Sequence, residues 1–282
     1  MANRLRGAAS GLIAAGLTGC AGAALAAGIG QPEEWQVAMQ QPVTAVAREM
    51  HDFHTELMWI ITAIVLFVLA LLVVVVVRFN ERANPTPSKT SHNTAIEIAW
   101  TVVPVLILLL IAIPSFRLLR NQLIIPNADI TLKTTGHSWY WSYEYPADQG
   151  GGFQFDANLI EAADLKPGQP RLLATDNEVV LPVNKVVRLQ TTSADVIHSW
   201  GVPSLGFTLD AVPGRLNEMW FKIEREGVYY GQCRELCGQR HAYMPITIRA
   251  VSEAEYAAWL AQAKQKFAST AADDAKLADA SR

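Results

Sequence analysis

The chain has 282 residues, of which 51% are hydrophobic and 17% are charged, so it is long enough for one compact domain and a separate membrane part. Its formal net charge is −3, and no cluster of Lys or Arg stands out, which argues against nucleic acid or another polyanion as a partner. Hydropathy varies strongly along the chain, because long apolar stretches precede a mostly polar second half.

Residues 1–27 are predicted to be an export signal, because two arginines precede a run of apolar and small residues. Two processing sites fit this segment. The tripeptide Ala24–Ala26 matches a signal peptidase site, whereas the Leu-Thr-Gly-Cys sequence ending at Cys20 is like a lipoprotein box, in which Cys20 would be lipidated. We favour the first site, which leaves Cys233 and Cys237 as the cysteines of the mature chain.

Two uncharged apolar stretches follow, at about residues 57–77 and 98–116. Each is long enough for a helix to cross a hydrocarbon core of about 30 Å. Pro104 and Pro114 lie in the second stretch, and membrane helices tolerate proline better than soluble helices do. Two buried core helices are the alternative, but the uninterrupted apolar length favours a transmembrane hairpin over residues 57–120.

The distribution of basic residues predicts the orientation of this hairpin. The loop 78–97 contains three Lys or Arg residues, whereas the segment 28–56 contains only Arg48. Because cytoplasmic loops carry the excess of basic residues, the loop is expected in the cytoplasm. The segment 28–56 and everything after the second span are then periplasmic, in a multi-pass protein of the bacterial inner (plasma) membrane.

Residues 121–251 change to short runs rich in β-branched residues, such as Ile130–Thr135 and Pro245–Arg249, with Gly, Pro and Asn between them. Many short strands in one domain predict a Greek-key sandwich or barrel. Residues 252–268 are expected to form a helix capped by Ser252, and residues 269–282, which are small and polar, a disordered tail.

Four side chains that bind soft metals gather in one short segment: Cys233, Cys237, His241 and Met244. His198, at the end of a strand-like run, is a fifth candidate. Thiolates, thioethers and imidazoles together select copper or zinc over hard cations. The segment therefore predicts a copper or zinc site.

Three simpler interpretations compete with a two-copper site. A disulfide between the two cysteines, usual in an exported domain, leaves His241 and Met244 unexplained. A structural zinc site with two Cys and two His does not need Met244. A mononuclear blue-copper site needs only one cysteine. Two thiolates that bridge two copper ions would use the whole set.

Three segments resemble the cytochrome c oxidase subunit II family: Asp195–Pro203 with the following Ser-Leu-Gly, Asp210–Asn217 and Tyr229–Gly238. The similarity extends from about His51 to the C-terminal helix. It implies a cupredoxin-like β domain after the membrane hairpin. It also implies a dinuclear copper A centre with these ligands: His198, Cys233, Cys237, His241, Met244 and the backbone carbonyl of Glu235.

The same resemblance implies further roles. Trp139, in the aromatic run Gly136–Tyr145, corresponds to a residue that receives the electron from cytochrome c, while the other rings of the run are expected to pack the strands. The Glu235 side chain would help to bind a magnesium ion shared with subunit I. Glu97 corresponds to a glutamate at the mouth of a proton channel. Thr208 departs from the family, which frequently has Lys there.

The family's activity implies the function. Electrons from cytochrome c would pass through copper A to the haem and copper centre of subunit I, where dioxygen is reduced to water with proton pumping. Subunit I, subunit III and membrane lipid are the other expected partners. The segment 121–282 carries 19 acidic and 15 basic residues, and its net negative charge would attract a basic cytochrome. Candidate docking residues are Glu144, Asp148, Asp156, Asp176 and Asp195.

Other functions remain open at this point. A nitric oxide or nitrous oxide reductase can also use copper A, although the two membrane spans argue against the second. A membrane-anchored copper-delivery protein is the non-enzymatic alternative, but it should need fewer ligands and no aromatic run around Trp139. His51 and His54 lie at helical spacing without an evident third ligand, so they are assigned no role.

Overall fold

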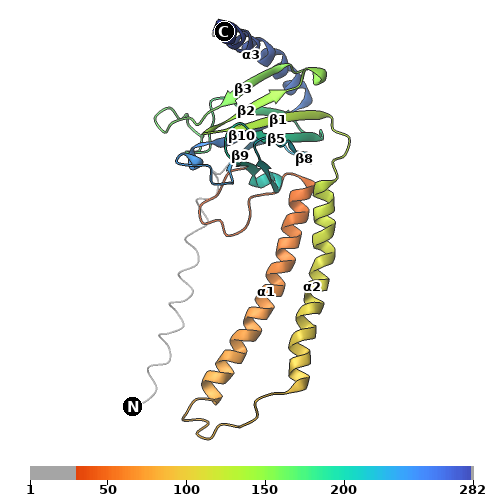
Figure 1. The fold of residues 1–282 in the computed structure, drawn as a ribbon, viewed down its shortest axis with the longest axis vertical. Coiled ribbons are helices and arrows are strands. Elements are labelled where there is room, and N and C mark those ends of the chain that lie inside the picture. Colours follow the sequence, from red (N-terminus) through yellow and green to blue (C-terminus); the bar gives the residue numbers. More distant parts are fainter. Residues whose placement is uncertain (1–29, 281–282) are drawn as a thin grey trace, which may run out of the picture.

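The structure is a computed structural model that describes residues 30–280, with side chains to residue 267. The predicted signal 1–27, with Cys20 and both candidate processing sites, lies outside the described residues. Within them, a hairpin of two long helices projects from a β domain, and a third helix packs on the far side of that domain (Figure 1).

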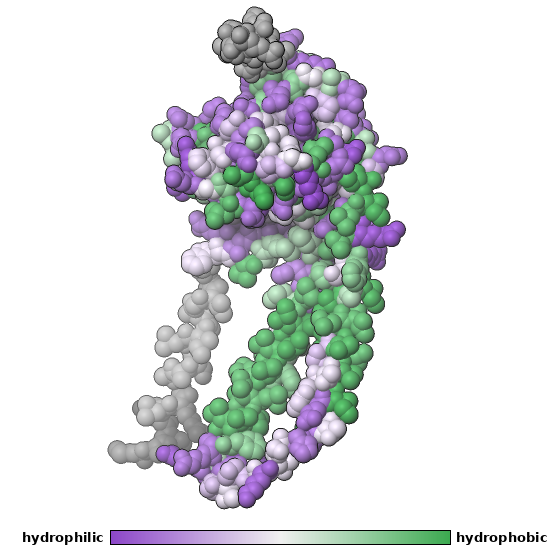
Figure 2. Space-filling view, viewed as in Figure 1, coloured by the Kyte–Doolittle hydropathy of each residue, from purple (hydrophilic) through white to green (hydrophobic). Residues whose placement is uncertain are grey.

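The hairpin consists of α1 (Ala45–Arg78) and α2 (Thr94–Leu123). The side chains of Thr44 and Asn93 cap the two helices by accepting backbone N–H groups of the first turn. Both helices are longer than the apolar spans predicted within them, and both are long and apolar enough to cross a membrane. Their exposed surface is hydrophobic, between the β domain and a hydrophilic connecting loop (Figure 2).

The β domain contains two five-stranded sheets. The first, in spatial order, consists of β3 (Phe153–Ala157), β2 (Tyr140–Tyr145), β1 (Ile130–His137), β5 (Val187–Ser193) and β8 (Asn217–Phe221). The second consists of β4 (Val179–Pro182), β10 (Pro245–Val251), β9 (Gly227–Cys233), β6 (His198–Val202) and β7 (Phe207–Ala211). Short 3-10 helices lie at η1 (Ala147–Gln149), η2 (Pro203–Leu205) and η3 (His241–Tyr243).

The core lies between the sheets. In β5, residues alternate between buried and half-buried, so one face of the strand points inward. Trp141, Tyr143 and Trp200 are among the largest fully buried side chains, and the indole N–H of Trp200 donates to the Tyr143 hydroxyl at 3.2 Å. The pairs β1–β5 and β4–β10 are parallel, whereas the other paired strands are antiparallel. This two-sheet, cupredoxin-like arrangement after a helix hairpin confirms the predicted fold class.

The start of α1 is built into the β domain. Val43 and Ala47 are buried, and the Thr44 hydroxyl donates to the carbonyl of Leu205 at 2.9 Å. The Arg48 guanidinium donates to both carboxylate oxygens of Glu224, at 2.6 and 2.9 Å. The hairpin is therefore fixed to the domain by apolar burial and a bidentate ion pair. These contacts fix the position of the β domain relative to α1.

α3 (Glu253–Ala280) begins where the sequence predicted, because Ser252 and Glu255 cap each other in a capping box. Trp259 and Phe267 pack on the aromatic rings of β2 and β3. The structure differs from the prediction at the other end, since the helix continues to Ala280 instead of giving way to a disordered tail after residue 268. The segment is rich in alanine, the strongest helix former, so local propensity favours the helix.

Candidate metal centre

The candidate ligands meet at one end of the three inner strands of the second sheet. His198 opens β6, Cys233 ends β9, and Met244 directly precedes β10. The three strands are neighbours in the order β10-β9-β6, and Trp200 of β6 is paired with Cys233 of β9. Sheet pairing thus brings His198 beside the cysteine segment, from which it is separated by 35 residues.

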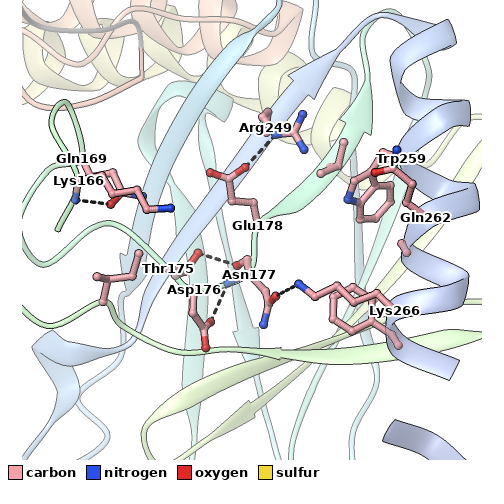
Figure 3. A pocket seen from close by; sticks show the side chains of 14 residues that line it. Lys166, Gln169, Thr175, Asp176, Asn177, Glu178, Arg249, Trp259, Gln262 and Lys266 are labelled. Atoms are coloured by element: carbon pink, nitrogen blue, oxygen red, sulfur yellow. Dashed lines mark hydrogen bonds and ion pairs between the residues drawn. The ribbon is translucent and has the colours of Figure 1, made fainter. Parts of the chain in front are cut away.

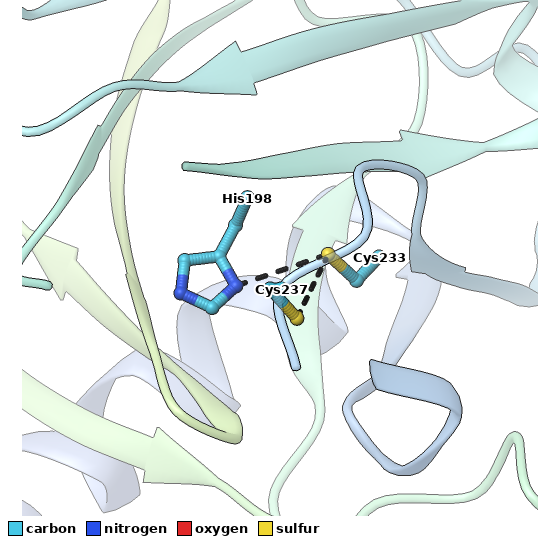
Figure 4. Close-up of side chains that lie close together, drawn as sticks. All are labelled: His198, Cys233 and Cys237. Carbon is cyan, nitrogen blue, oxygen red and sulfur yellow. Dashed lines mark hydrogen bonds between the residues drawn. The ribbon is translucent and has the colours of Figure 1, made fainter. Parts of the chain in front are cut away.

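The two thiols lie at the centre of the cluster (Figure 4). Their sulfur atoms are 3.9 Å apart, and the Cys233 sulfur lies 3.9 Å from Nδ1 of His198. The Cys237 sulfur lies 3.4 Å from Nδ1 of His241 and 3.5 Å from the thioether sulfur of Met244. The five donor atoms therefore form one connected cluster, in which each thiol lies beside an imidazole and Cys237 also lies beside the thioether.

These distances fit a shared metal site and not a disulfide. A disulfide requires a sulfur separation of about 2.05 Å, whereas two sulfurs bound to one ion at about 2.3 Å each can be up to about 4.6 Å apart. The observed 3.9 Å lets both thiols reach the same ion. The donor atoms of His198, Cys233 and Cys237 all lie within 4.8 Å of one another, and these side chains are buried.

The loop between the cysteines adds a backbone carbonyl oxygen that could bind a metal ion. The carbonyl oxygen of Glu235 lies 3.3 Å from the Cys233 sulfur, so it borders the same space. The backbone N–H of Arg234 donates to the carbonyl of Ser199 at 2.8 Å, which ties this loop to β6. The side chain of Glu235 is exposed, so it is available to a partner.

A carboxylate behind His198 orients its imidazole. The Asp195 carboxylate lies 2.8 Å from Nε2 of His198 and accepts the backbone N–H groups of Ser138 and Val196, at 2.7 and 2.6 Å. If Nε2 donates to Asp195, Nδ1 carries the lone pair that faces Cys233. The sequence suggested Asp195 only as a residue that docks cytochrome c. Its position three residues before a candidate histidine was the one feature that could have indicated this orienting role.

The same contacts set the local electrostatics. Burial by itself would raise the pKa of the Asp195 carboxyl, but hydrogen bonds from His198, Val196 and Ser138 outweigh it and lower the pKa. Burial would lower the pKa of His198, and its contacts with Cys233 and Asp195 outweigh that effect and raise it. Burial, together with the neighbouring Cys233, raises the pKa of the Cys237 thiol to about 12. A metal ion must displace that proton on binding.

Two tryptophans hold the ligand loop from the first sheet. The Trp139 indole N–H donates to the carbonyl of Cys237 at 3.2 Å, and Trp139 is half-buried. The Trp141 indole N–H donates to the carbonyl of Met244 at 3.3 Å, and its ring lies edge-on to His198 at 5.9 Å. Trp141 was predicted to do no more than pack the strand. Its contacts with two candidate ligands were not visible in the sequence.

Other predicted residues lie apart from the cluster. Glu97 is in the first turn of α2, at the end of the hairpin far from the β domain (Figure 1). Thr208 is on β7 opposite Gly201, where its methyl group and the Arg234 side chain approach the same glycine. His51 has a buried Nε2 without a hydrogen-bond partner among residues 30–280, and nothing in the structure gives it a role.

The candidate docking acids differ in what they already bind. Glu144 pairs with Lys133 at 2.8 Å, and Asp156 accepts the Ser142 hydroxyl at 2.6 Å. Asp176 accepts the backbone N–H of Asn158 at 2.7 Å. Asp148 lies in η1. Local partners account for three of these carboxylates, so their presence alone does not identify a docking surface.

A separate cavity of about 390 Å³ lies between α3, β4 and β10 (Figure 3). It shares no residue with the thiol cluster. Two of its cationic side chains have partners in the cavity wall, since Arg249 pairs with Glu178 at 2.8 Å and Lys266 donates to the Asn177 side chain at 2.9 Å. We assign it no function.

Comparison with known proteins places the chain among oxidase subunits. Residues 130–251 match the family model "Cytochrome C oxidase subunit II, periplasmic domain", and residues 32–118 match its transmembrane domain. A probable cytochrome c oxidase subunit 2 of Rickettsia bellii is 51% identical over 248 residues, 88% of this chain and 91% of the relative. Cytochrome c oxidase subunit 2 of Cereibacter sphaeroides is 46% identical over 251 residues, 84% and 83% of the two chains.

Among solved structures, the chain is similar to the crystal structure of the periplasmic domain of subunit II of cytochrome oxidase of Bradyrhizobium japonicum. The identity is 55%, and the alignment covers 51% of this chain and 99% of that one, with a TM-score of 0.48. The family-model matches and the two oxidase relatives give no support to the copper-delivery and reductase alternatives.

Proposed function

This chain belongs to the cytochrome c oxidase subunit II family, and we propose that its buried cluster is the copper A centre at which electrons from cytochrome c enter the oxidase. It is a membrane-anchored subunit of a haem-copper oxidase, with its β domain in the periplasm, and it does not itself contain the oxygen-reducing site. The observation that carries the proposal is the pair of free, buried thiols 3.9 Å apart with imidazole and thioether donors around them.

The proposed ligands are His198, Cys233, Cys237, His241 and Met244, with the carbonyl of Glu235. A dinuclear copper centre supplies a one-electron acceptor and donor whose charge change is shared between two ions. The chain's own residues keep the site rigid: Asp195 fixes the ring of His198, and Trp141 holds the backbone at Met244. Because both thiols are buried at the end of the inner strand β9 and in the loop after it, water is kept from them.

We propose Trp139 as the residue through which electrons enter. Its ring is half-buried, so one part can meet a docked protein while the indole N–H contacts the carbonyl of Cys237. One hydrogen bond and a short stretch of covalent bonds thus connect the ring with a candidate ligand. A second connection runs from the N–H of Ser138 through the Asp195 carboxylate to His198.

Three further assignments rest on the family resemblance. The exposed Glu235 carboxylate suits a magnesium ion shared with subunit I, because hard oxygen ligands are what magnesium prefers. Glu97, half-buried in the first turn of α2, suits the mouth of a proton channel on the cytoplasmic side. Subunit III is proposed as a further partner. We also propose these domain boundaries: an export signal at residues 1–27, a transmembrane hairpin at 57–120 and a copper-binding domain at 121–251.

Copper content and electron paramagnetic resonance of the full chain in detergent test the copper assignment. We expect a mixed-valence signal with hyperfine splitting from two equivalent copper nuclei. Cys233→Ser should abolish that signal, and Asp148→Asn, in η1 and outside the cluster, should leave it intact. A mononuclear copper spectrum, or bound zinc, would overturn the proposal.

A further inference from the structure

A groove between α1 and α2 lies immediately below the β domain. Its upper part, about 240 Å³, is lined by Glu49, Asp52, Glu56 and Arg117, among others. Its lower part, about 600 Å³, is lined mainly by apolar side chains, including Leu57, Ile60 and Leu110. The two parts share Phe53, Glu56 and Pro114, so they form one continuous interhelical groove with a charged end and an apolar end.

Helical periodicity explains why these residues face one another. Positions 49, 52, 53, 56 and 60 recur at intervals of three and four, so they form one stripe along α1. Positions 110, 114, 117 and 121 form the facing stripe of α2. The Asn121 side chain donates to the Glu49 carboxylate at 2.9 Å, which closes the groove at its upper end.

The charged end lies at the height of the lipid headgroups. Asp52 and Glu56 precede the apolar span that begins at residue 57, and Arg117 directly follows the span that ends at residue 116. Within the described residues, the side chains of these three charged residues make no hydrogen bond or ion pair, although Asp52 interacts electrostatically with Arg48, one turn before it on α1. Positively and negatively charged side chains are therefore available for binding beside the apolar end of the groove, which enters the hydrocarbon region.

We propose that this groove binds a zwitterionic phospholipid with a primary amine, of the phosphatidylethanolamine type. The Arg117 guanidinium matches the lipid phosphate, and the carboxylates of Asp52 and Glu56 match the ammonium group. An acyl chain lies along Leu57, Ile60 and Leu110. A purely anionic lipid would be repelled by the carboxylates, and a choline headgroup has no N–H to donate to them.

Lipid retention by the purified oxidase complex tests this proposal. The complex is equilibrated in nanodiscs with equal phosphatidylethanolamine and phosphatidylcholine, transferred to mild detergent, and its bound lipids are counted by native mass spectrometry. We expect preferential retention of phosphatidylethanolamine by the wild type. Arg117→Gln, and the double change Asp52→Asn with Glu56→Gln, should each weaken it about tenfold, since each removes charge-assisted contacts.

Arg82→Gln, in the loop at the opposite end of the hairpin, is the matched control and should retain the lipid. Equal retention in all variants, or no preference for phosphatidylethanolamine in the wild type, would overturn the proposal. A photoreactive benzophenone side chain in place of Ile60 gives an independent test. Its cross-link should be to lipid, and a cross-link to another subunit would show that protein fills the groove instead.

Discussion

Replacing Asp195 by asparagine should weaken copper binding even though Asp195 is not a proposed ligand. The substitution keeps the size and shape of the side chain and removes its negative charge. His198 is fully buried, and the carboxylate contact at its Nε2, at 2.8 Å, fixes which nitrogen faces the thiols. An amide in this place can also donate to the ring, which favours the wrong tautomer.

The magnitude follows from the contact. Loss of a carboxylate partner behind a metal-binding histidine typically costs about 10- to 100-fold in metal affinity. The Asp195 side chain is 36% exposed, so solvent screens part of its charge. We therefore expect an effect at the lower end of this range. Copper binding should be about tenfold weaker, which corresponds to about 1.4 kcal/mol of binding free energy.

Competition with a copper chelator, followed by electron paramagnetic resonance, measures this change on the full chain. Asp148→Asn, a change of the same kind in η1, is the control and should leave the affinity unchanged. If Asp195 served only to dock cytochrome c, Asp195→Asn would raise the KM for cytochrome c and leave copper affinity as in the wild type. That result would refute the orienting role.

Three further predictions concern electron entry, packing and pH. Trp139→Phe keeps an aromatic ring but loses the donor to the carbonyl of Cys237, so electron transfer from cytochrome c should slow while the copper spectrum is preserved, as stopped-flow kinetics can measure. Gly206→Ala places a Cβ 2.6 Å from the backbone at the start of α1, at a glycine with φ of +83°, and should destabilise the chain by about 1–3 kcal/mol, seen as a lower Tm. The hydrogen bond from Arg48 lowers the pKa of Glu224, so its stabilising effect is present at neutral pH and is lost as the pH falls through that lowered pKa. Glu224→Gln should therefore lose less Tm on acidification than the wild type does, and an equal loss would contradict this origin.

The membrane hairpin and the ligand types were predictable from the sequence because they depend on local properties. The apolar length of residues 57–77 and 98–116 sets the spans within α1 and α2. The spacing of Cys233, Cys237, His241 and Met244 keeps these side chains close in any compact turn. Short β-rich runs with turn residues between them predicted a Greek-key sandwich or barrel, and two packed five-stranded sheets are found.

The predicted end of the C-terminal helix was wrong for a different reason. Residues after 268 were judged by their polarity, which predicts that they bury little, whereas their alanine content favours a helix without burial. The two signals oppose each other there, and the structure follows the helical propensity.

Only the tertiary structure decided which distant groups complete the site. Pairing of β6 with β9 brings His198 to Cys233, and packing of the first sheet on the second places the N–H of Trp141 on the carbonyl of Met244. The second role of Asp195 follows from the same arrangement. Strand pairing and sheet packing join segments far apart in the chain, and no local pattern of charge, hydropathy or spacing encodes those contacts. The sequence by itself therefore determined which donors are present, and the fold determined how they are held.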